Sequence, residues 1–444
     1  MHSEQRENLA KRALEMAGAA DEAEVLVSSD DSALTRFTHQ VCNQNVASAD
    51  VGVSVRAIVE KRIGVARTNR FDDESLREVV DRAIQMARLA PNDPLQPALP
   101  RGGKTATPPG AYDEATAGAA AGLRASMCDT IFREAEAAGQ WCAGYVSTSS
   151  TGYSVCNTSG ATASFDGSDA AVNVKMNAPD STGFAEAYSP CVAAIDAGSV
   201  GRRATSKAAG AMHPVAVDPG AWTVVLEPTA FGELFVYLAH HFSAQTFDEG
   251  SSFCSDGLDR SYFGENFSLR DDYAHPLNPG MPFDFEGQPT TKLSLVESGV
   301  VRNVVTDSYY AHKLERPNTG HAMPAPNAFG PQARNLAIAA GNKSLEQLID
   351  ETKRGLLISR FWYIRTVDEK KAVVTGMTRD GTFLIEDGRV VRGVRNLRFN
   401  QSILDALRRC ELSDEQTRTG SYHYSLVAPA VKIENFRFTS STEF

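Results

Sequence analysis

The chain has 444 residues, of which 42% are hydrophobic and 22% are charged, and its formal net charge is -11. This length exceeds what one ordinary hydrophobic core accommodates, so we expect two domains. The acidic balance argues against direct nucleic-acid binding over the whole surface, because phosphate contacts need clustered lysine and arginine. The sequence contains no apolar run that could cross a bilayer, so no membrane partner is expected.

The number and spacing of the cysteines indicate the cellular compartment. There are seven, and none forms a C-x-x-C pair of the kind found in zinc knuckles or thioredoxin-like motifs. An odd, dispersed set is typical of reduced thiols. Residues 1–7 also lack the apolar core of a signal peptide. We therefore expect a cytoplasmic protein.

The first half of the sequence alternates predicted helices and strands. Residues 4–17 form the first predicted helix. Two short strands are expected at residues 23–28 and 33–38, and the alternating valines of residues 51–59 predict another. Glu60-Lys61-Arg62 then turns the chain into a further strand.

The clearest helix signal spans residues 76–90. Apolar residues recur there at i, i+3, i+4 and i+7, as expected for one buried face. Acidic residues at 72–74 suit a helix N-terminus, and Pro91 ends the helix. A further helix follows, and residues 140–188, rich in Ser, Thr, Gly and Val, predict an antiparallel meander. The apolar residues expected on the buried face of that further helix are Leu123, Met127 and Ile131.

A change of pattern near residues 209–220 predicts a domain boundary. A strand at 222–226 and a helix at 229–241 open the second half, which otherwise consists mainly of short strands and hairpin turns. We therefore predict an α+β fold. An N-terminal α/β domain with antiparallel strands and packed helices would occupy residues 1–212, and a C-terminal mainly-β domain residues 213–444.

Common catalytic motifs are missing from the sequence. It contains no G-x-G-x-x-G dinucleotide loop, no complete phosphate loop and no G-x-S-x-G nucleophile elbow. Cys254 could be a nucleophile, but no neighbour in the sequence would lower its pKa, so a buried or incidental thiol is the better interpretation. We assign no catalytic residue.

The adjacent pair His240-His241 ends the predicted helix at 229–241. A helix presents two metal ligands on one face at i and i+4, whereas adjacent residues point about 100° apart. No second ligand stands at the right offset: His241, for example, has Tyr237 and Gln245 there. We therefore assign no metal ligand in this chain and favour a capping or solvent-facing role for the pair.

Polar loops of the second half predict a substrate groove. Asp284 and Glu286 lie close together in one loop, and His321 follows in another. Together with His241, these residues are our candidates for a groove lining, because charged loop residues on a β scaffold often carry function. The alternative is that the acidic residues cap turns and His321 satisfies a backbone carbonyl.

These segments, taken in order, resemble the TldD/PmbA family, also labelled modulators of DNA gyrase. Each motif alone is modest, but the ordered set covers nearly the whole chain. The family's TldD-type members carry an H-E-x-x-x-H zinc motif on the helix after the strand that opens the second domain. The matching segments are Arg62-Ile63-Gly64-Val65-Ala66-Arg67-Thr68, Val224-Val225-Leu226-Glu227-Pro228, Asp271-Asp272, Asp284-Phe285-Glu286-Gly287, Thr319-Gly320-His321 and Gly376-Met377-Thr378-Arg379-Asp380-Gly381.

The resemblance implies a member without its own zinc site. At the positions of the zinc motif this chain has Val236, Tyr237 and, last, His241, so one histidine of the motif remains. TldD-type members also use a cysteine near the C-terminus, and none follows Cys410 here. The resemblance is therefore to the PmbA/TldE type, with zinc expected in a TldD-type partner.

The resemblance implies a subunit of a TldD/TldE-type cytosolic metallopeptidase complex. In the family, the two chain types enclose a chamber that degrades unfolded or flexible peptides or trims peptide precursors. The alternative is a homodimeric, non-catalytic binding or regulatory protein. A third interpretation is a protease with its own unfamiliar site. The sequence names neither the peptide substrate nor which partner, a TldD-type chain or a second copy, is used.

Overall fold

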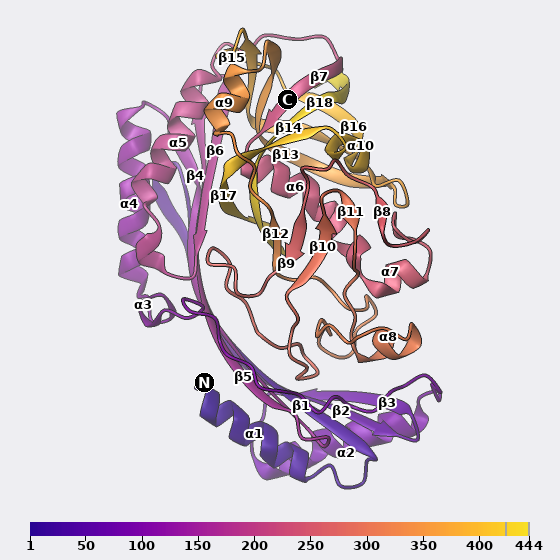
Figure 1. The fold of residues 1–444 in the computed structure, drawn as a ribbon. Helices are drawn as coiled ribbons and strands as arrows, with labels where there is room; N and C mark the ends of the chain where they lie inside the picture. The colour runs from indigo at the N-terminus through magenta and orange to yellow at the C-terminus, as the bar shows by residue number, and fades with distance from the viewer. Residues whose placement is uncertain (422–423, 443–444) are drawn as a thin grey trace.

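The computed structural model describes residues 1–421 and 424–442, and these residues form two β-sheets with helices packed against them (Figure 1). The first sheet is antiparallel throughout and has the order β3-β2-β1-β4-β5-β6. Its strands are β1 (Glu22–Thr38), β2 (Val41–Val59), β3 (Arg62–Thr68), β4 (Trp141–Asn157), β5 (Thr162–Ala178) and β6 (Ser181–Ser189).

The four inner strands of this sheet are unusually long. Strands β1, β4 and β5 each have 17 residues, and β2 has 19. The middles of β1, β4 and β5 are polar, at residues 29–32, 147–151 and 166–169, and these segments pair with one another across the sheet. The prediction of two short strands at 23–28 and 33–38 was therefore wrong, because the polar segment between them lies within one continuous strand.

Two separate cores lie on the two ends of this sheet. Helices α1 (Ser3–Glu15) and α2 (Asp73–Leu89) cover one end, and α4 (Ala121–Ala137) and α5 (Ala197–Gly210) cover the other. Figure 1 shows all four on the outer, convex side of the curved sheet. The two apolar cores thus lie at the strand ends, whereas the polar middle is contacted by the short helix α3 (Glu114–Ala117) and the loop before it, where Asp113 N–H donates to the Ser168 hydroxyl at 2.8 Å.

Buried arginines satisfy polar groups in the polar middle of the sheet. Arg6 of α1 donates to the carbonyl of Phe165 at 3.1 Å and pairs with Asp166 at 2.7 Å. Arg124 of α4 donates to the hydroxyl of Thr148 at 3.1 Å. Arg124 occupies a buried position, whereas Leu123, predicted on the buried stripe, is 39% exposed. Met127 and Ile131 of the predicted stripe are buried, and the prediction is wrong only for Leu123, whose place in the stripe is taken by Arg124.

The second sheet forms the inner layer, and the first sheet curves around it (Figure 1). Its pairings are antiparallel except for β7 with β13 and β12 with β18. Its strands are β7 (Gly220–Leu226), β8 (Arg260–Ser261), β9 (Leu269–Asp271), β10 (Leu293–Glu297), β11 (Val300–Val301), β12 (Leu336–Ile338), β13 (Arg354–Asp368), β14 (Val373–Glu386), β15 (Arg389–Gly393), β16 (Leu397–Ser402), β17 (Cys410–Ser421) and β18 (Tyr424–Ser441).

Helix α6 (Pro228–Ala239) packs its apolar side into the large core of this second sheet. The remaining helices are short and sit in connections. They are α3 (Glu114–Ala117), α7 (Ala244–Asp248), α8 (Ser308–Lys313), α9 (Leu345–Asp350) and α10 (Ile403–Leu407). The predicted α+β class is confirmed.

Charged side chains join the two sheets. Arg56 of β2 binds Glu24 of β1 at 2.8 Å and Glu286 of a C-terminal loop at 2.9 Å. Lys207 of α5 pairs with Glu227 at the start of α6. In chain order the first sheet ends at Ser189 and the second begins at Gly220, and the boundary at 212/213 stays a prediction.

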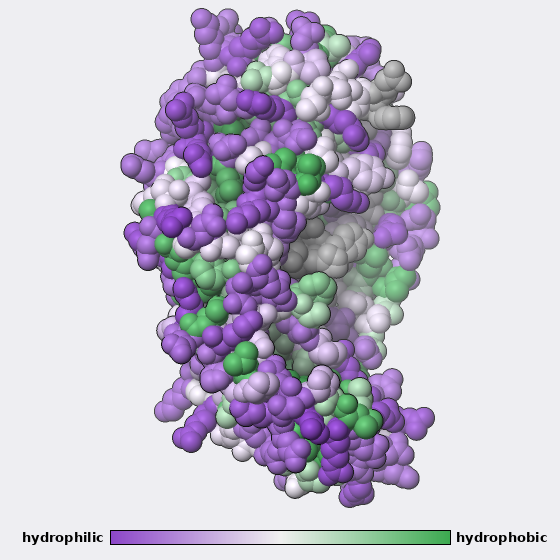
Figure 2. All heavy atoms as spheres, turned by 90° about the vertical axis from the view of Figure 1, so that its right-hand side faces the viewer, coloured by the Kyte–Doolittle hydropathy of each residue, from purple (hydrophilic) through white to green (hydrophobic). Residues whose placement is uncertain are grey.

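Figure 2 shows that one whole face of the molecule is mainly hydrophilic, with hydrophobic residues in small separate groups. Among the described residues, no helix combines the length and the apolar character needed to cross a membrane.

Candidate functional site

Helix α6 has one buried face and one face that borders a cavity. It starts at Pro228, whose fixed φ suits a first helical turn. Glu233, Val236 and Tyr237 share the cavity side, at i, i+3 and i+4. The cavity measures about 550 Å³ and lies between α6, β13 and the inner face of the first sheet. Its polar and aromatic lining comprises Tyr145, Asn173, Glu186, Tyr188, Glu233, Tyr237, Arg360, Phe361, Trp362, Tyr363 and Arg365.

Glu233 is a half-buried carboxylate in this lining. It accepts hydrogen bonds from Nε of Arg360 at 3.2 Å and from the backbone N–H of Phe361 at 2.6 Å. Burial raises the pKa of Glu233 to about 7, and Glu186 adds to the rise, whereas Arg360 opposes it. This carboxyl group therefore gains or loses a proton near neutral pH.

Glu186, on β6, is the second carboxylate of the cavity and, at 7% exposure, is buried. It accepts hydrogen bonds from the hydroxyls of Tyr188 at 3.0 Å and Thr229 at 3.1 Å. Burial raises the pKa of Glu186 and also that of Tyr188, so the tyrosine keeps its proton and acts as the donor. The first sheet and helix α6 thus each contribute one acidic group to the same cavity.

Arg360 is held by aromatic rings as well as by carboxylates. Its guanidinium lies 4.0 Å from the ring centre of Phe184 and 5.0 Å from that of Trp362, and it reaches Asp380 at 3.5 Å. Tyr363, next to Trp362, is 62% exposed. The cavity therefore combines fixed charges inside with exposed aromatic surface at its edge, a lining suited to an extended polar chain.

The end of α6 differs from the prediction. The helix stops at Ala239, and His240–Phe242 form a tighter 3-10 turn. This turn rotates His241 away from the helix face that carries Glu233 and Tyr237. The His241 side chain is 1% exposed, and its ring packs against Phe253. The structure therefore does not bring His241 to the cavity.

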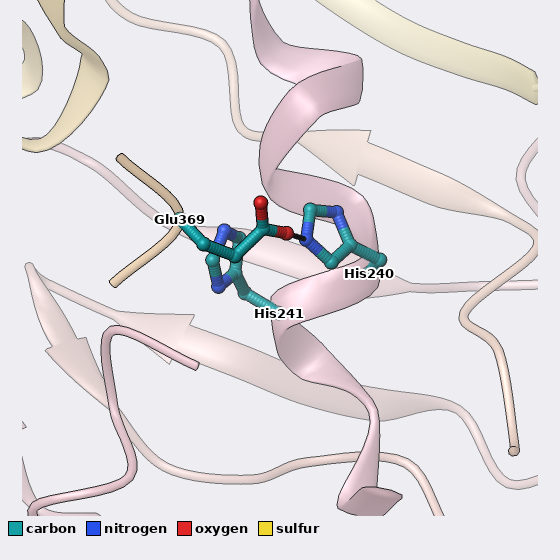
Figure 3. A group of neighbouring side chains, drawn as sticks. All are labelled: His240, His241 and Glu369. Atoms are coloured by element: carbon teal, nitrogen blue, oxygen red, sulfur yellow. Dashed lines mark hydrogen bonds and ion pairs between the residues drawn. The ribbon is translucent and has the colours of Figure 1, made fainter. Parts of the chain in front are cut away.

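His240, His241 and Glu369 form a side-chain cluster at this turn (Figure 3). In the described part of the chain, it is the one group of three or more His, Cys, Asp or Glu whose ligand atoms lie within 4.8 Å of one another. Nε2 of His240 bonds the Glu369 carboxylate. Nδ1 of His241 accepts the Phe253 N–H at 3.3 Å, so Nε2 of its neutral ring carries hydrogen.

The tautomer of His241 determines what a metal ion would have to displace at this cluster. Burial lowers the pKa of His241 to about 3, so its ring is neutral at ordinary pH. A metal at the cluster would have to displace either the Phe253 N–H from Nδ1 or the hydrogen from Nε2. That this chain has no metal ligand stays a prediction. Glu369 is a potential metal ligand that the sequence did not indicate.

The three other groove candidates lie together, at a distance from α6 along the chain. Asp284 and His321 are fully buried, and Glu286 is 7% exposed. Asp284 accepts three backbone N–H bonds, from Glu286, Gln288 and Ala322, at 2.9 to 3.0 Å. Burial and the nearby Glu286 raise the pKa of Asp284 to about 8. These contacts tie two loops together, as the turn-capping alternative expects.

His321 and Glu286 have different surroundings. Nδ1 of His321 contacts the Thr319 hydroxyl at 2.9 Å, and Nε2 lies 3.5 Å from Asp271. Glu286 instead borders a second cavity of about 570 Å³, between α2, β3 and the C-terminal loops, where it bonds Arg56. Glu286 is thus the one groove candidate of the four that borders either of these two cavities.

Sequence reasoning missed most of the lining of the α6 cavity. Glu186 and Arg360 are far from α6 in the chain and carry no local motif. Glu233 is not among the site residues predicted from the sequence. Its i+3 spacing to Val236, one of the two positions matched to the zinc motif, is the signal that could have identified it.

Family comparisons define the class of protein. Residues 219–440 match the model described as PmbA/TldA metallopeptidase C-terminal domain, and residues 23–87 match PmbA/TldA metallopeptidase domain 1. The fold and these matches define a metallopeptidase-related protein. The chain belongs to the PmbA/TldD family.

Curated relatives match over part of their length. Metalloprotease PmbA of Escherichia coli O157:H7 is 24% identical over 206 residues, 45% of this chain and 43% of that protein. A zinc metalloprotease TldD homolog of Saccharolobus solfataricus is 27% identical over 143 residues, 31% of each chain. The alignments thus span less than half the length of these relatives.

Solved structures match over the whole chain. TldE from Thermococcus kodakarensis has a TM-score of 0.88 at 22% identity, covering 98% of this chain and 99% of that one. A modulator of DNA gyrase from Thermotoga maritima has a TM-score of 0.86 at 18% identity, covering 98% and 100%. At these identities the likeness establishes the fold.

Proposed function

We propose that this chain is a TldE-like subunit of a cytosolic peptidase complex, paired with a TldD-type chain that carries the zinc. The observation that carries the proposal is the cavity side of α6. Val236 and Tyr237 stand there at the positions matched to the zinc motif, and neither has a side chain that normally binds zinc.

The donor groups of this cavity do not fit a catalytic zinc. Such a site needs about three protein ligands and an open position. The Tyr237 hydroxyl donates to the carbonyl of Ile364 at 2.7 Å, and the Glu233 carboxylate is bonded to Arg360 and the Phe361 N–H. The zinc chemistry therefore belongs to the partner in this proposal, and no catalytic step is assigned to this chain.

The role of this chain would be to hold peptide. An unfolded peptide offers backbone N–H and C=O groups of uniform spacing, which the hydroxyl of Tyr188 and the carboxylates of Glu186 and Glu233 can bond. Trp362 and Tyr363 at the edge can contact side chains of many shapes, consistent with broad selection. The cytoplasmic location is in keeping with seven free cysteines.

Co-expression with the TldD-type chain of the same host tests the proposal. We expect a co-purifying complex that cleaves unfolded peptides, and no stoichiometric zinc in the isolated chain. The finding of about one tightly held zinc per isolated chain would refute the assignment, because three ligands would then have to exist.

A substitution tests the cavity. Glu233→Gln should lower peptide turnover by the complex while leaving assembly intact, because it removes the charge and keeps the side-chain size. Glu249→Gln, at an exposed position after α7, is the matched control and should change neither. Equal turnover in both variants would show that the cavity does not hold substrate.

A further inference from the structure

The second cavity lies where the first sheet meets the C-terminal loops. It measures about 570 Å³ and is bounded by β3 and the end of α2 on one side, and by α8 and the loop at residues 322–330 on the other (Figure 1). This volume is ordinary for a small-molecule site. None of its lining residues also lines the α6 cavity, so a ligand bound here would not depend on the proposed peptidase role.

Most of the wall of this second cavity is apolar. Strand β3, helix α2 and the loop at residues 322–330 all contribute to it, and Tyr309 and Tyr310 of α8 stand beside it with their ring centres 5.3 Å apart. Such a wall favours the apolar part of a ligand, because contact removes both surfaces from water. The larger apolar side chains of the wall are Ile63, Val65, Met86, Met323 and Pro326.

The charged part of the lining is acidic. It contains the carboxylates of Asp93, Glu286 and Asp307 and one cation, the guanidinium of Arg56. Arg56 binds Glu286 at 2.9 Å and also Glu24 at 2.8 Å, so its single charge is already shared between two carboxylates. The cavity therefore has an excess of negative charge.

Asp307 is the carboxylate that lacks a cation of its own. This half-buried side chain accepts the N–H of Tyr310 at 2.8 Å through Oδ1, whereas Oδ2 accepts no hydrogen bond from another described residue. Burial raises the pKa of Asp307 to about 6, and Glu286 adds to the rise. At pH 7.5 the group is therefore mainly ionised, a state that a bound cation would stabilise.

Glu286 lies next to Asp307. Its Oε2 accepts the N–H of Ser308, the residue that follows Asp307, at 3.2 Å. Each carboxylate oxygen has two lone pairs, so both groups can accept further hydrogen bonds without losing their present partners. The two carboxylates thus form an acceptor pair at one side of an otherwise apolar cavity.

We propose that this second cavity binds a primary ammonium group carried on an apolar body, with the ammonium at Asp307 and Glu286 and the body against the apolar wall. An ammonium group supplies three N–H donors and a positive charge, which the carboxylate pair can accept. The ring of Tyr309 offers a further favourable contact for a cation. A neutral ligand of the same shape would leave Asp307 without a cation. The same chemistry is present in a free amine and in the amino terminus of a peptide.

A ligand-observed NMR titration of the full chain at pH 7.5 tests the ligand class. The amine 2-phenylethylamine should bind at least about tenfold more tightly than 2-phenylethanol, which has the same shape without the charge. The tripeptide Phe-Ala-Ala amide presents the same group as a peptide amino terminus. Tighter binding of the amine would identify a free amine as the ligand, and tighter binding of the tripeptide a peptide amino terminus.

The substitution Asp307→Asn locates the site. Asparagine keeps the size of the side chain and still caps α8, so the variant should keep its melting temperature while amine binding weakens about tenfold. Asp72→Asn is the matched control, because Asp72 caps α2 by accepting the Ser75 N–H at 2.9 Å and does not line the cavity. This control should bind the amine as the wild type does.

Three results would overturn the proposal. They are a lack of binding of both the amine and the tripeptide, equal affinity of the wild type for 2-phenylethylamine and 2-phenylethanol, and equal amine affinity of the Asp307→Asn and Asp72→Asn variants. The comparison of amine with alcohol uses the wild type, so it holds even if Asp307→Asn lowers the melting temperature. Because Asp307 lies outside the α6 cavity, none of these results decides whether Glu233→Gln lowers peptide turnover.

Discussion

Arg56 is the best single position for testing how the two sheets are held together. Its guanidinium bridges Glu24 and Glu286, and the three side chains are only 5 to 11% exposed. Replacing Arg56 by methionine keeps the length of the side chain but leaves two buried carboxylates without their cation. Removing one partner of a buried ion pair typically costs about 3–5 kcal/mol, so we expect a loss of that size at pH 8.

The loss should depend on pH in a defined direction. Burial raises the pKa of Glu24 to about 7, above the usual 4.5, although Arg56 lowers it. A raised carboxyl pKa means that the folded state is favoured when the group is protonated, and that this advantage is lost as pH rises from about 4.5 through 7. In the wild type, the stability lost over this pH range amounts to about 3 kcal/mol. Without Arg56 the Glu24 pKa rises further, so the variant should lose more stability at pH 8 than at pH 5.5.

Urea denaturation at the two pH values measures the effect. Arg67→Met is the control, because Arg67 is exposed on β3 and donates one hydrogen bond across to the carbonyl of Ala325. We expect this control to lose about 1 kcal/mol or less at either pH. A loss for Arg56→Met no larger than that of the control, or one that is equal at both pH values, would refute the reasoning.

Two further predictions concern packing and acid stability. An alanine at Gly64 would place its Cβ 2.0 Å from the Ala83 carbonyl oxygen of α2, so Gly64→Ala should cost about 3 kcal/mol in thermal or urea unfolding. Gly122→Ala, where no heavy atom lies within 4 Å, should be neutral or slightly stabilising, and equal losses would contradict the argument. Burial lowers the pKa of His241 to about 3, so its neutral form favours folding above pH 6.5 and this stability is lost as pH falls towards 3. His241→Gln should therefore lose about 3 kcal/mol less than the wild type between pH 7 and pH 4, and parallel pH profiles would contradict this.

The elements that the sequence predicts best are those that bury one face against a single neighbouring layer. The periodic apolar residues of residues 76–90 became α2, with Val79, Val80, Ala83 and Ile84 all buried against the sheet. The meander predicted for residues 140–188 became β4, β5 and β6. In both cases the local pattern repeats with the period of the structure, so the sequence alone carries the information.

The long strands show where local patterns fail. Residues 29–32 look like a turn because they are polar, yet they continue β1. They lie between the two apolar cores of the sheet, where Arg6 of α1 donates to the Ser29 hydroxyl at 3.3 Å. The positions of these cores are set only when helices separated by many residues have packed, so no local window of sequence contains this information.

The candidate site likewise combines features set by the local sequence with features set by tertiary packing. By itself, the sequence determined the α+β class, the family resemblance and the helix that carries Val236 and Tyr237. The tertiary structure alone decided that Glu186 and Arg360 meet Glu233 in one cavity, and that the 3-10 turn removes His241 from it. Helix periodicity fixes which residues share a face, whereas a cavity depends on which distant strands face that helix, and this is set by the packing of the two sheets.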